Sequence, residues 1–143
     1  ELGSMAVTEQ IDAIRILGAD PVRKLVLPRV VAMVVALPLL TIMADVVGCV
    51  GGGLITMFEV DVSFKFVTEQ MLTTAGIPDL VHGLAKSAFF GYFIAIIGCW
   101  NGMTTRGGTE GVGRATTNTV VYTSITILVS DFILTRVFLA IYG

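Results

Sequence analysis

The stretch that decides the fold is Val30-Val-Ala-Met-Val-Val-Ala-Leu-Pro-Leu-Leu-Thr-Ile-Met-Ala44, which contains one hydroxyl group and no charge. It lies inside a nearly continuous apolar run over residues 25–58. A helix needs about 20 apolar residues to cross the hydrocarbon of a bilayer. Because the run is longer than this, we expect a membrane span that tilts or kinks, with the kink at Pro38.

The composition of the whole chain also indicates a membrane protein. Of its 143 residues, 55% are hydrophobic and 14% are charged, and the net charge is −2. Soluble domains carry about 25% charged residues. Disorder is excluded by the high hydrophobicity, and the negative charge argues against a nucleic-acid partner. Two cysteines are too few for a disulfide-stapled secreted domain.

Outward from this stretch, the pattern predicts an all-α integral membrane protein with three transmembrane helices. Residues 80–104 and 115–142 are the other two apolar segments. Residues 8–17 predict a short amphipathic helix, with Thr8 as its N-cap and Gly18 as its stop. Residues 59–79 form an acidic connection that predicts a short helix on the membrane surface. Residues 105–114 form a glycine-rich turn.

The distribution of basic residues predicts the orientation. Six of the nine lysines and arginines fall on one side of a three-span arrangement, namely Arg15, Arg23, Lys24, Arg29, Arg106 and Arg114. Since basic loops stay in the cytoplasm, we expect the 8–17 helix and the 105–114 turn to be cytoplasmic. The 59–79 connection and the C-terminus are then expected on the outer, periplasmic side.

The third span carries a stripe of hydroxyl side chains at helical spacing. Its members include Thr116, Thr119, Thr123, Thr126 and Ser130. Hydroxyl side chains gain no partner from lipid tails, so the stripe is expected to face other helices or a cavity. Packing against another helix is the favoured interpretation, and lining a substrate path is the alternative.

Two carboxylates, Asp45 and Asp131, are expected at similar depth in the membrane, where charge is costly and often functional. We expect a structural ion pair, with Arg136 able to reach one of them, and a proton relay is the alternative. Small-residue spacings at Gly48/Gly52 and Gly98/Gly102 predict close helix packing within the chain or in a dimer.

The sequence gives little indication that the protein is an enzyme. A phosphate-binding G-K-[ST] motif is missing, so we expect no nucleotide hydrolysis by this chain. One histidine, His82, and two distant cysteines, Cys49 and Cys99, do not predict a metal site. We therefore expect no catalytic residue, no metal and no cofactor. An intramembrane enzyme would need a buried catalytic group, and Ser87 is poorly placed to pair with His82.

Specific strings resemble one family. Glu-Leu-Gly-Ser-Met-Ala-Val-Thr-Glu-Gln-Ile-Asp-Ala-Ile (1–14), Gly-Ala-Asp-Pro-Val-Arg (18–23) and Leu-Pro-Arg (27–29) resemble the MlaE family of ABC transporter permeases. So do Gly-Cys-Trp-Asn-Gly-Met-Thr-Thr-Arg-Gly-Gly-Thr-Glu-Gly-Val-Gly-Arg-Ala-Thr-Thr (98–117) and Asp-Phe-Ile-Leu-Thr (131–135). The similarity runs end to end but matches the C-terminal part of the family pattern, so we expect a portion of a roughly five-span permease.

The resemblance implies a permease subunit, in the bacterial inner membrane, for phospholipid or related lipid moving between the inner and outer membranes. It implies three protein partners: a cytoplasmic ABC ATPase, a periplasmic MCE-domain protein and a second permease copy in a homodimer. A passive membrane assembly subunit or a channel is the alternative function. A channel would need charged or carbonyl rings along a wet pore.

The resemblance also implies a role for the 8–17 helix. In ABC permeases a short cytoplasmic helix enters a cleft of the ATPase. From the residues alone, a helix lying on the membrane surface is an equal alternative. The residues expected to couple to the ATPase are apolar in the groove and polar at its rim, namely Ile11, Ile14 and Leu17, with Glu9, Gln10, Asp12 and Arg15.

Overall fold

The computed structural model describes residues 1–60, 62–74 and 76–142, and within them the chain is helical without strands. The elements are α1 (Leu2–Val7), α2 (Gln10–Ile16), a π-helical turn η1 (Val22–Val26), α3 (Leu27–Val60), α4 (Phe64–Thr74), α5 (Ile77–Met103) and α6 (Gly108–Tyr142). Three stretches in the described part are long and apolar enough to cross a membrane: Val22–Glu59, Pro78–Met103 and Gly108–Ile141. The predicted all-α membrane fold with three spans is confirmed.

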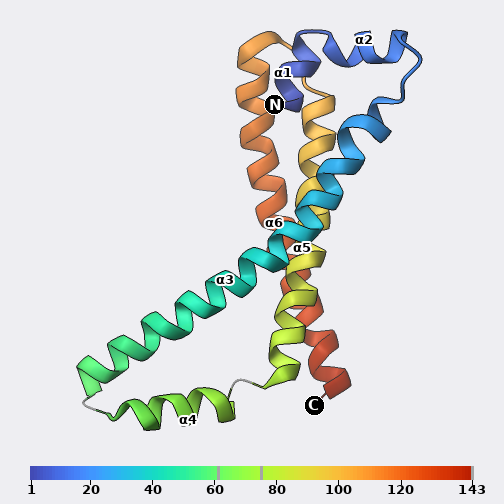
Figure 1. Cartoon of the computed structure of the whole chain (residues 1–143). Helices are drawn as coiled ribbons and strands as arrows, with labels where there is room; N and C mark the ends of the chain where they lie inside the picture. Colours follow the sequence, from blue (N-terminus) through green and yellow to red (C-terminus); the bar gives the residue numbers. More distant parts are fainter. Residues whose placement is uncertain (61, 75, 143) are drawn as a thin grey trace.

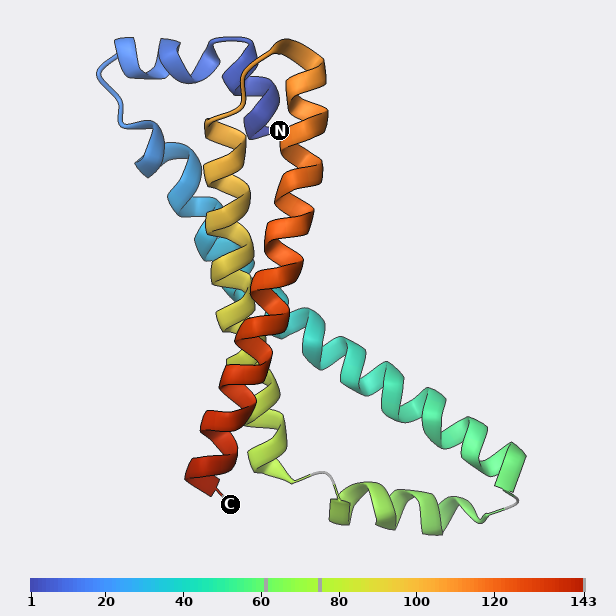
Figure 2. The same cartoon turned by 180° about the vertical axis from the view of Figure 1, so that it is seen from behind.

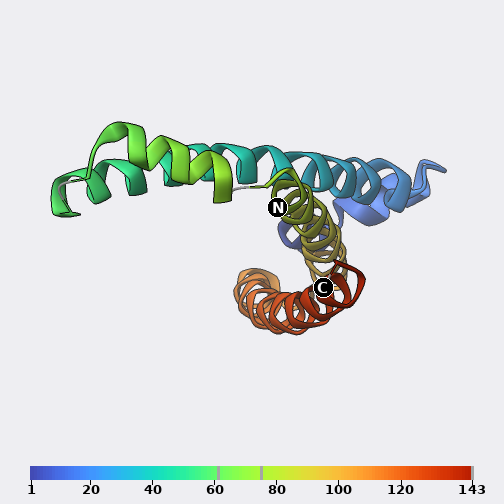
Figure 3. The ribbon, with the colours of Figure 1, turned by 90° about the horizontal axis from the view of Figure 1, so that it is seen from below.

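The three long helices form an open arrangement. α5 and α6 run side by side, and α3 crosses α5 near its middle (Figures 1 and 2). α1, α2 and the α5–α6 turn lie at one end, which we call the α2 end. α4 and the C-terminus lie at the other, the α4 end (Figure 1). Seen from below, α3 passes across α5 and extends to both sides of it, and α4 lies along the second half of α3 (Figure 3).

The crossing of α3 and α5 depends on one glycine. A Cβ atom added to Gly91 would lie 2.8 Å from the carbonyl oxygen of Met33 and 3.1 Å from the side chain of Leu37. The two backbones therefore approach more closely than any side chain at this position would permit. Beyond this crossing, α3 diverges from α5 (Figures 1 and 2).

Pro38 lies inside α3, directly after the crossing. Proline has no N–H to donate to the preceding turn, which weakens the helix locally. The hydroxyl of Thr41 donates to the carbonyl of Leu37 at 2.9 Å. Figure 1 shows α3 taking a shallower course in its second half, as expected for a helix with a proline at this point.

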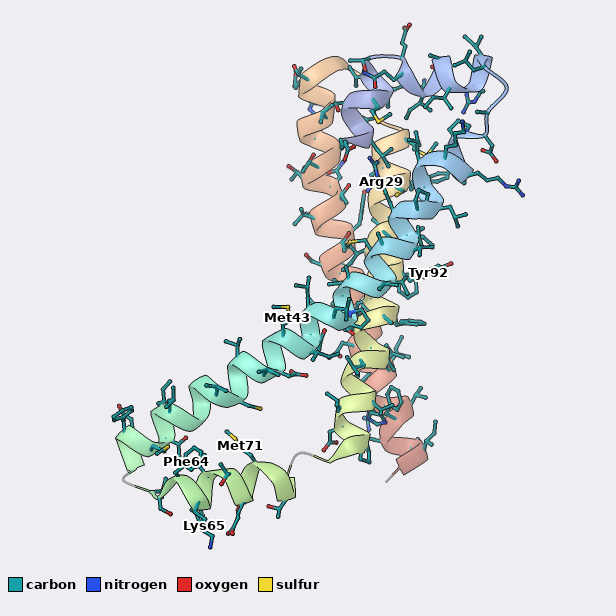
Figure 4. The ribbon with its side chains drawn as sticks, viewed as in Figure 1. Arg29, Met43, Phe64, Lys65, Met71 and Tyr92 are labelled. Atoms are coloured by element: carbon teal, nitrogen blue, oxygen red, sulfur yellow. The ribbon has the colours of Figure 1, made fainter. Side chains whose placement is uncertain are left out.

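α4 packs against the far half of α3. Figure 4 shows Phe64 and Met71 pointing toward α3 and Lys65 pointing away from it. A Cβ on Gly53 of α3 would lie 3.1 Å from Cε of Met71 and 3.4 Å from Cγ1 of the buried Val67. Gly53 thus lets this amphipathic helix lie close to the span.

The N-terminal segment differs from the single helix predicted for residues 8–17. Two helices form instead, because Glu9 adopts a left-handed conformation (φ +58°) between α1 and α2. Thr8 is not an N-cap, since its hydroxyl donates back to the carbonyl of Ser4 at 2.9 Å. Gly18 has φ +76° two residues after α2, as expected for a helix stop.

The turn between the second and third spans is shorter than the predicted 105–114. α6 begins at Gly108, because Gly107 and Gly108 reverse the chain with φ +91° and +68°. A Cβ on Gly111 would overlap the carbonyl oxygen of Arg106, so the turn requires glycine there. In the first turns of α6, Arg114 forms an exposed ion pair with Glu110 at 2.7 Å, and the negative charge of Glu110 suits a helix N-terminus.

Candidate functional site

α2 forms an exposed face across the α2 end of the molecule, outside the three spans (Figure 1). Its last apolar residues are largely bare, with Ile16 86% exposed and Leu17 83% exposed. Its predicted polar rim is also exposed, and consists of Glu9, Gln10, Asp12 and Arg15. Arg15 pairs with Asp12 at 3.4 Å, but such an open pair contributes little to stability. The exposed side chains within residues 9–17 are therefore open to another surface; they are Glu9, Gln10, Asp12, Arg15, Ile16 and Leu17.

The structure places Ile11 differently from the prediction, which put it in the partner's groove. Ile11 is 5% exposed and lies toward α1 and the α5–α6 turn. Ile14 is half-buried. Because α1 packs under α2, the first apolar position of α2 is used inside the chain. The apolar residues open to a partner are Ile16 and Leu17, at the C-terminal end of α2.

α1 fixes α2 to the spans. Leu2 is 6% exposed, and a Cβ on Gly102 of α5 would lie 2.7 Å from the Cβ of Leu2. One residue on, a Cβ on Gly3 would lie 3.3 Å from the hydroxyl oxygen of Thr105. Arg29 of α3 reaches Glu1 at 2.8 Å, and its side chain is partly buried between the helices (Figure 4). α1 therefore connects α2 to α5 and α6 by packing, and to α3 through the Glu1–Arg29 pair.

A polar hollow of about 700 Å³ lies between α2 and the turn that joins α5 to α6. Its ionisable lining combines Glu9 and Asp12 with Arg15 and Arg106. Acidic and basic groups are thus both presented next to the exposed face of α2. This arrangement suits a protein surface with mixed charges better than a small ion of one sign.

An apolar groove of about 550 Å³ runs between α3 and α6, with α5 as its floor. The floor is made of small residues, Ala95, Gly98, Cys99 and Gly102, and α1 closes the groove at the α2 end. The sequence predicted close packing on the small residues of α5. At this level of α5, α3 and α6 lie on either side of these residues, and a groove is left between the two helices.

The hydroxyl stripe of α6 turns in part toward α5. Thr123 is buried, while Thr119, Thr126 and Ser130 are half-buried. Thr119 lies against Gly98, whose Cβ position is 3.9 Å from its Cγ2 atom. Its hydroxyl donates within α6, to Ala115 at 2.7 Å. The stripe therefore contributes small side chains to packing, and the hydroxyl hydrogen bonds found in the described residues stay within the helix.

Asp131 forms an ion pair, as expected, but its partner is Lys86 and not Arg136. Nζ of Lys86 donates to Oδ1 of Asp131 at 3.0 Å and to the hydroxyl of Thr135 at 2.7 Å. The guanidinium of Arg136 instead lies over the ring of Phe132 at 5.7 Å. Asp45 is exposed on the half of α3 that diverges from α5, so it does not join this cluster.

Sequence reasoning missed this pair because it sought a partner among the arginines. A lone lysine inside an apolar span itself predicts a nearby carboxylate, since a charge at this depth needs a partner. Within the described residues, no group of three or more histidine, cysteine or acidic side chains is placed to hold a metal ion.

Comparison with known proteins places these features in one family. The family model described as Permease MlaE matches residues 1–137, which include α1, α2 and nearly all of the three spans. The chain belongs to the MlaE permease family. The match includes α2, its seat on α1 and the Lys86–Asp131 pair, so all of these lie within the family region.

Individual relatives support the assignment. A probable ABC transporter permease protein of Rickettsia felis is 40% identical over 139 residues, which cover 96% of this chain and 53% of the relative. The chloroplastic protein TRIGALACTOSYLDIACYLGLYCEROL 1 of Arabidopsis thaliana is 40% identical over 138 residues, covering 96% and 39%. The intermembrane phospholipid transport system permease protein MlaE of Haemophilus influenzae is 33% identical over 138 residues, covering 96% and 53%.

This MlaE-family chain spans about half the length of the bacterial relatives it matches. It is a multi-pass membrane protein of the ABC permease type, and its described residues contain three helices long and apolar enough to cross a membrane.

Proposed function

We propose that this chain is part of a permease subunit that moves phospholipid, or a related lipid, between the bacterial inner and outer membranes. Family membership supports the proposal, together with the word phospholipid in the name of the Haemophilus influenzae relative. The chain would sit in the inner membrane. The permease makes and breaks no covalent bond, and ATP hydrolysis belongs to a partner subunit.

The observation that carries the proposal is the exposed face of α2, fixed to two spans through α1. An ATPase that binds residues 9–17 would push or pull on α5 and α6 through α1, which packs on both helices. Apolar Ile16 and Leu17 would enter the cleft of the ATPase, and the charged rim would pair at its edge. This role requires the α2 end to be cytoplasmic, in agreement with the basic residues gathered there.

The apolar groove between α3 and α6 is a candidate for one wall of the lipid path. Lipid tails need an apolar surface, and small floor residues leave room for them. In the proposed mechanism, nucleotide-driven movement of α2 alternately exposes an apolar cavity at the axis of a permease homodimer. α4 then lies on the periplasmic side, where an MCE-domain protein would receive or deliver the lipid.

The test is charge reversal on α2 in the full-length permease. Glu9→Lys combined with Asp12→Lys alters two exposed side chains, so the spans should fold unchanged. We expect the ATPase to be lost from the purified complex, and nucleotide-stimulated lipid transfer between reconstituted vesicles to fall to background. Glu69→Lys, an exposed reversal on α4 at the opposite end, is the matched control and should leave both readouts intact.

A second variant tests the apolar contact separately. Ile16→Ser with Leu17→Ser should weaken ATPase binding while retaining the charged rim. If the charge-reversed permease still purifies with its ATPase and still transfers lipid, the coupling role of α2 is wrong. If the intact complex transfers no lipid in response to nucleotide, the transport function itself is wrong, and a passive assembly subunit or channel takes its place.

A further inference from the structure

The face that α3 turns toward α5 at their crossing continues into the second half of the helix, where its residues are exposed. The positions recur at steps of four and three residues, as expected for one face of a helix. The first three are half-buried and the last three are exposed; in chain order they are Val34, Pro38, Thr41, Asp45, Gly48 and Gly52. A Cβ atom added to Gly48 or to Gly52 would contact nothing beyond its own helix within 4 Å. The three exposed residues, which we call the Asp45 face, are therefore open to another helix.

Asp45 is a charge in an apolar setting. Residues 30–44 before it and 46–58 after it carry no charge. None of the ion pairs found in the described residues includes its carboxylate. Its side chain tilts toward the N-terminus of α3, and therefore away from the membrane surface at the α4 end. Because a carboxylate inside a span needs a partner, the Asp45 face fits a helix that supplies a cation.

α6 offers an exposed face of this kind. Its positions recur at steps of three and four residues, which is the spacing of a seam between two helices. Five apolar residues and one arginine form it; in chain order they are Tyr122, Ile125, Val129, Phe132, Arg136 and Leu139. The apolar members are 54–64% exposed, and Arg136 is exposed as well. This face, the Arg136 face, is distinct from the hydroxyl stripe that turns toward α5.

Arg136 is the cation available to Asp45 in the α4 half of the described residues. Lys86 is held by Asp131, and Lys65 points away from α3 (Figure 4). The other six lysines and arginines of the chain belong to the elements and helix ends of the α2 end. Charge complementarity therefore matches the Asp45 face to the Arg136 face.

The crossing of α3 and α5 gives a common level from which depth can be compared. Lys86 and Asp131 are paired across the antiparallel helices α5 and α6. Gly91, five residues nearer the α2 end of α5, is therefore level with Thr126 of α6. Because Met33 lies against Gly91, α3 passes this level at Met33.

Measured from this level, the two charges lie at comparable depth toward the α4 end. Asp45 is twelve residues, about 18 Å, along α3, and Arg136 is ten residues, about 15 Å, along α6. α3 takes the shallower course, which leaves Asp45 nearer the centre of the membrane (Figure 1). The guanidinium of Arg136 is displaced in the same direction, since it lies over the ring of Phe132, one turn nearer the α2 end.

Within one chain, α5 separates these two faces. Figure 3 shows α6 and the second half of α3 as two sides of an open angle, with α5 at its corner. Both helices run from the α2 end to the α4 end (Figure 1). A twofold axis inside this angle, along the membrane normal, places the α6 of each copy against the α3 of the other. The two contacts then form together, and the assembly closes as a dimer.

We propose that a second copy of this chain covers the Asp45 face, with the carboxylate of Asp45 paired to the guanidinium of Arg136 of the partner subunit. The Arg136 face packs on the small surface of Gly48 and Gly52, and the pair forms twice around the axis. Contact between the two α6 helices themselves is disfavoured, because parallel copies would bring two guanidinium groups together. The inference rests on the proposed function in one respect, namely that two permease copies act together.

Site-directed cross-linking of the full-length permease in membranes tests the pair. Two differently tagged copies are expressed together in a background of Cys49→Ser and Cys99→Ala, one with Asp45→Cys and the other with Arg136→Cys. A short bis-methanethiosulfonate reagent should join the two tags in one product of twice the permease mass. Val47→Cys replaces Asp45→Cys in the matched control, because Val47 is 70% exposed on the opposite side of α3. This control should give no joined product above background.

A charge exchange tests recognition separately. Energy transfer between donor-labelled and acceptor-labelled permease in detergent measures the association of the two copies on dilution. Asp45→Arg or Arg136→Asp alone should raise the dissociation constant about tenfold, the value of about one polar contact between membrane helices. The double variant should recover to within about threefold of the wild-type protein, a rescue that a loss of folding would not permit.

Three results would overturn the proposal: no joined product from Asp45→Cys with Arg136→Cys, a joined product from Arg136→Cys alone, or a double variant as weak as the single ones. The second of these would mean that the two α6 helices meet instead. Because the readouts need neither nucleotide nor lipid transfer, a failure here is distinguishable from a failure of transport.

Discussion

Replacing Gly102 by alanine tests whether α1 is seated on α5 by close backbone contact. The new Cβ would lie 2.7 Å from the Cβ of Leu2. Two carbon atoms in ordinary contact are about 3.5–4.0 Å apart. α1 would have to move away from α5 by about 1 Å. The atom in the way is the Cβ of Leu2, which is fixed to the backbone and cannot swing aside as the end of a flexible side chain could.

The magnitude follows from overpacking, which costs about 1–3 kcal/mol. The gain in helix propensity from glycine to alanine is the same whether α1 is docked on α5 or not, so it does not offset this cost. At the lower limit of about 1 kcal/mol, the opening equilibrium of α1 changes about fivefold. Gly98→Ala is the matched control on the same helix, because its nearest neighbour, Cγ2 of Thr119, is at an ordinary 3.9 Å.

Amide hydrogen exchange of the full-length permease in detergent reads this seat directly. The amides of Met5 and Thr8 donate to the carbonyls of Glu1 and Ser4, both at 3.0 Å, so they report on whether α1 is formed and docked. We expect their exchange to be about fivefold faster in Gly102→Ala and unchanged in Gly98→Ala. Equal exchange in the two variants would refute the reasoning that the Leu2–Gly102 contact holds α1.

Three further predictions concern the packing of the spans. Gly91→Ala should destabilise the protein by about 1–3 kcal/mol, because its Cβ would lie 2.8 Å from the backbone oxygen of Met33. The measurement is the thermal midpoint in detergent, which should fall. An unchanged midpoint would contradict the close approach of α3 and α5 at Gly91. Lys86→Met should lower the thermal midpoint more than the double variant Lys86→Met/Asp131→Leu, because the single change leaves the carboxylate of Asp131 unpaired. A double-mutant cycle should give a coupling energy of about 1 kcal/mol between the two residues. Thr123→Val should leave stability unchanged or raise it slightly in the same assay, because its buried hydroxyl has no partner in the described part of the chain; a clear loss would show that the hydroxyl is used.

Much of the fold follows from the sequence because it depends on local properties. An apolar run long enough to cross a bilayer must be a helix, since every backbone polar group there needs a partner within its own segment. Gly107 and Gly108 reverse the chain because their conformations are open to glycine. The family resemblance also follows from the sequence, because a motif consists only of residue types in a given order.

The partners of individual side chains were not available in this way. Asp131 binds Lys86, which lies 45 residues away in the chain and becomes its neighbour only when α5 and α6 pack in antiparallel register. Arg136 lies five positions further along α6 and points to Phe132 instead. Ile11 matched the amphipathic pattern of a docking helix, yet the unpredicted α1 buries it.

The sequence by itself determined that the protein lies in a membrane and which class it belongs to: three membrane-spanning helices, basic at one end, with a short polar helix beside them. What only the tertiary structure decided is where the helices meet. Gly91 and Gly102 are two of many glycines in the sequence, and they matter because Met33 and Leu2 lie against them. Periodicity describes one helix at a time, whereas a contact is a property of two helices, fixed by crossing points that no single segment encodes.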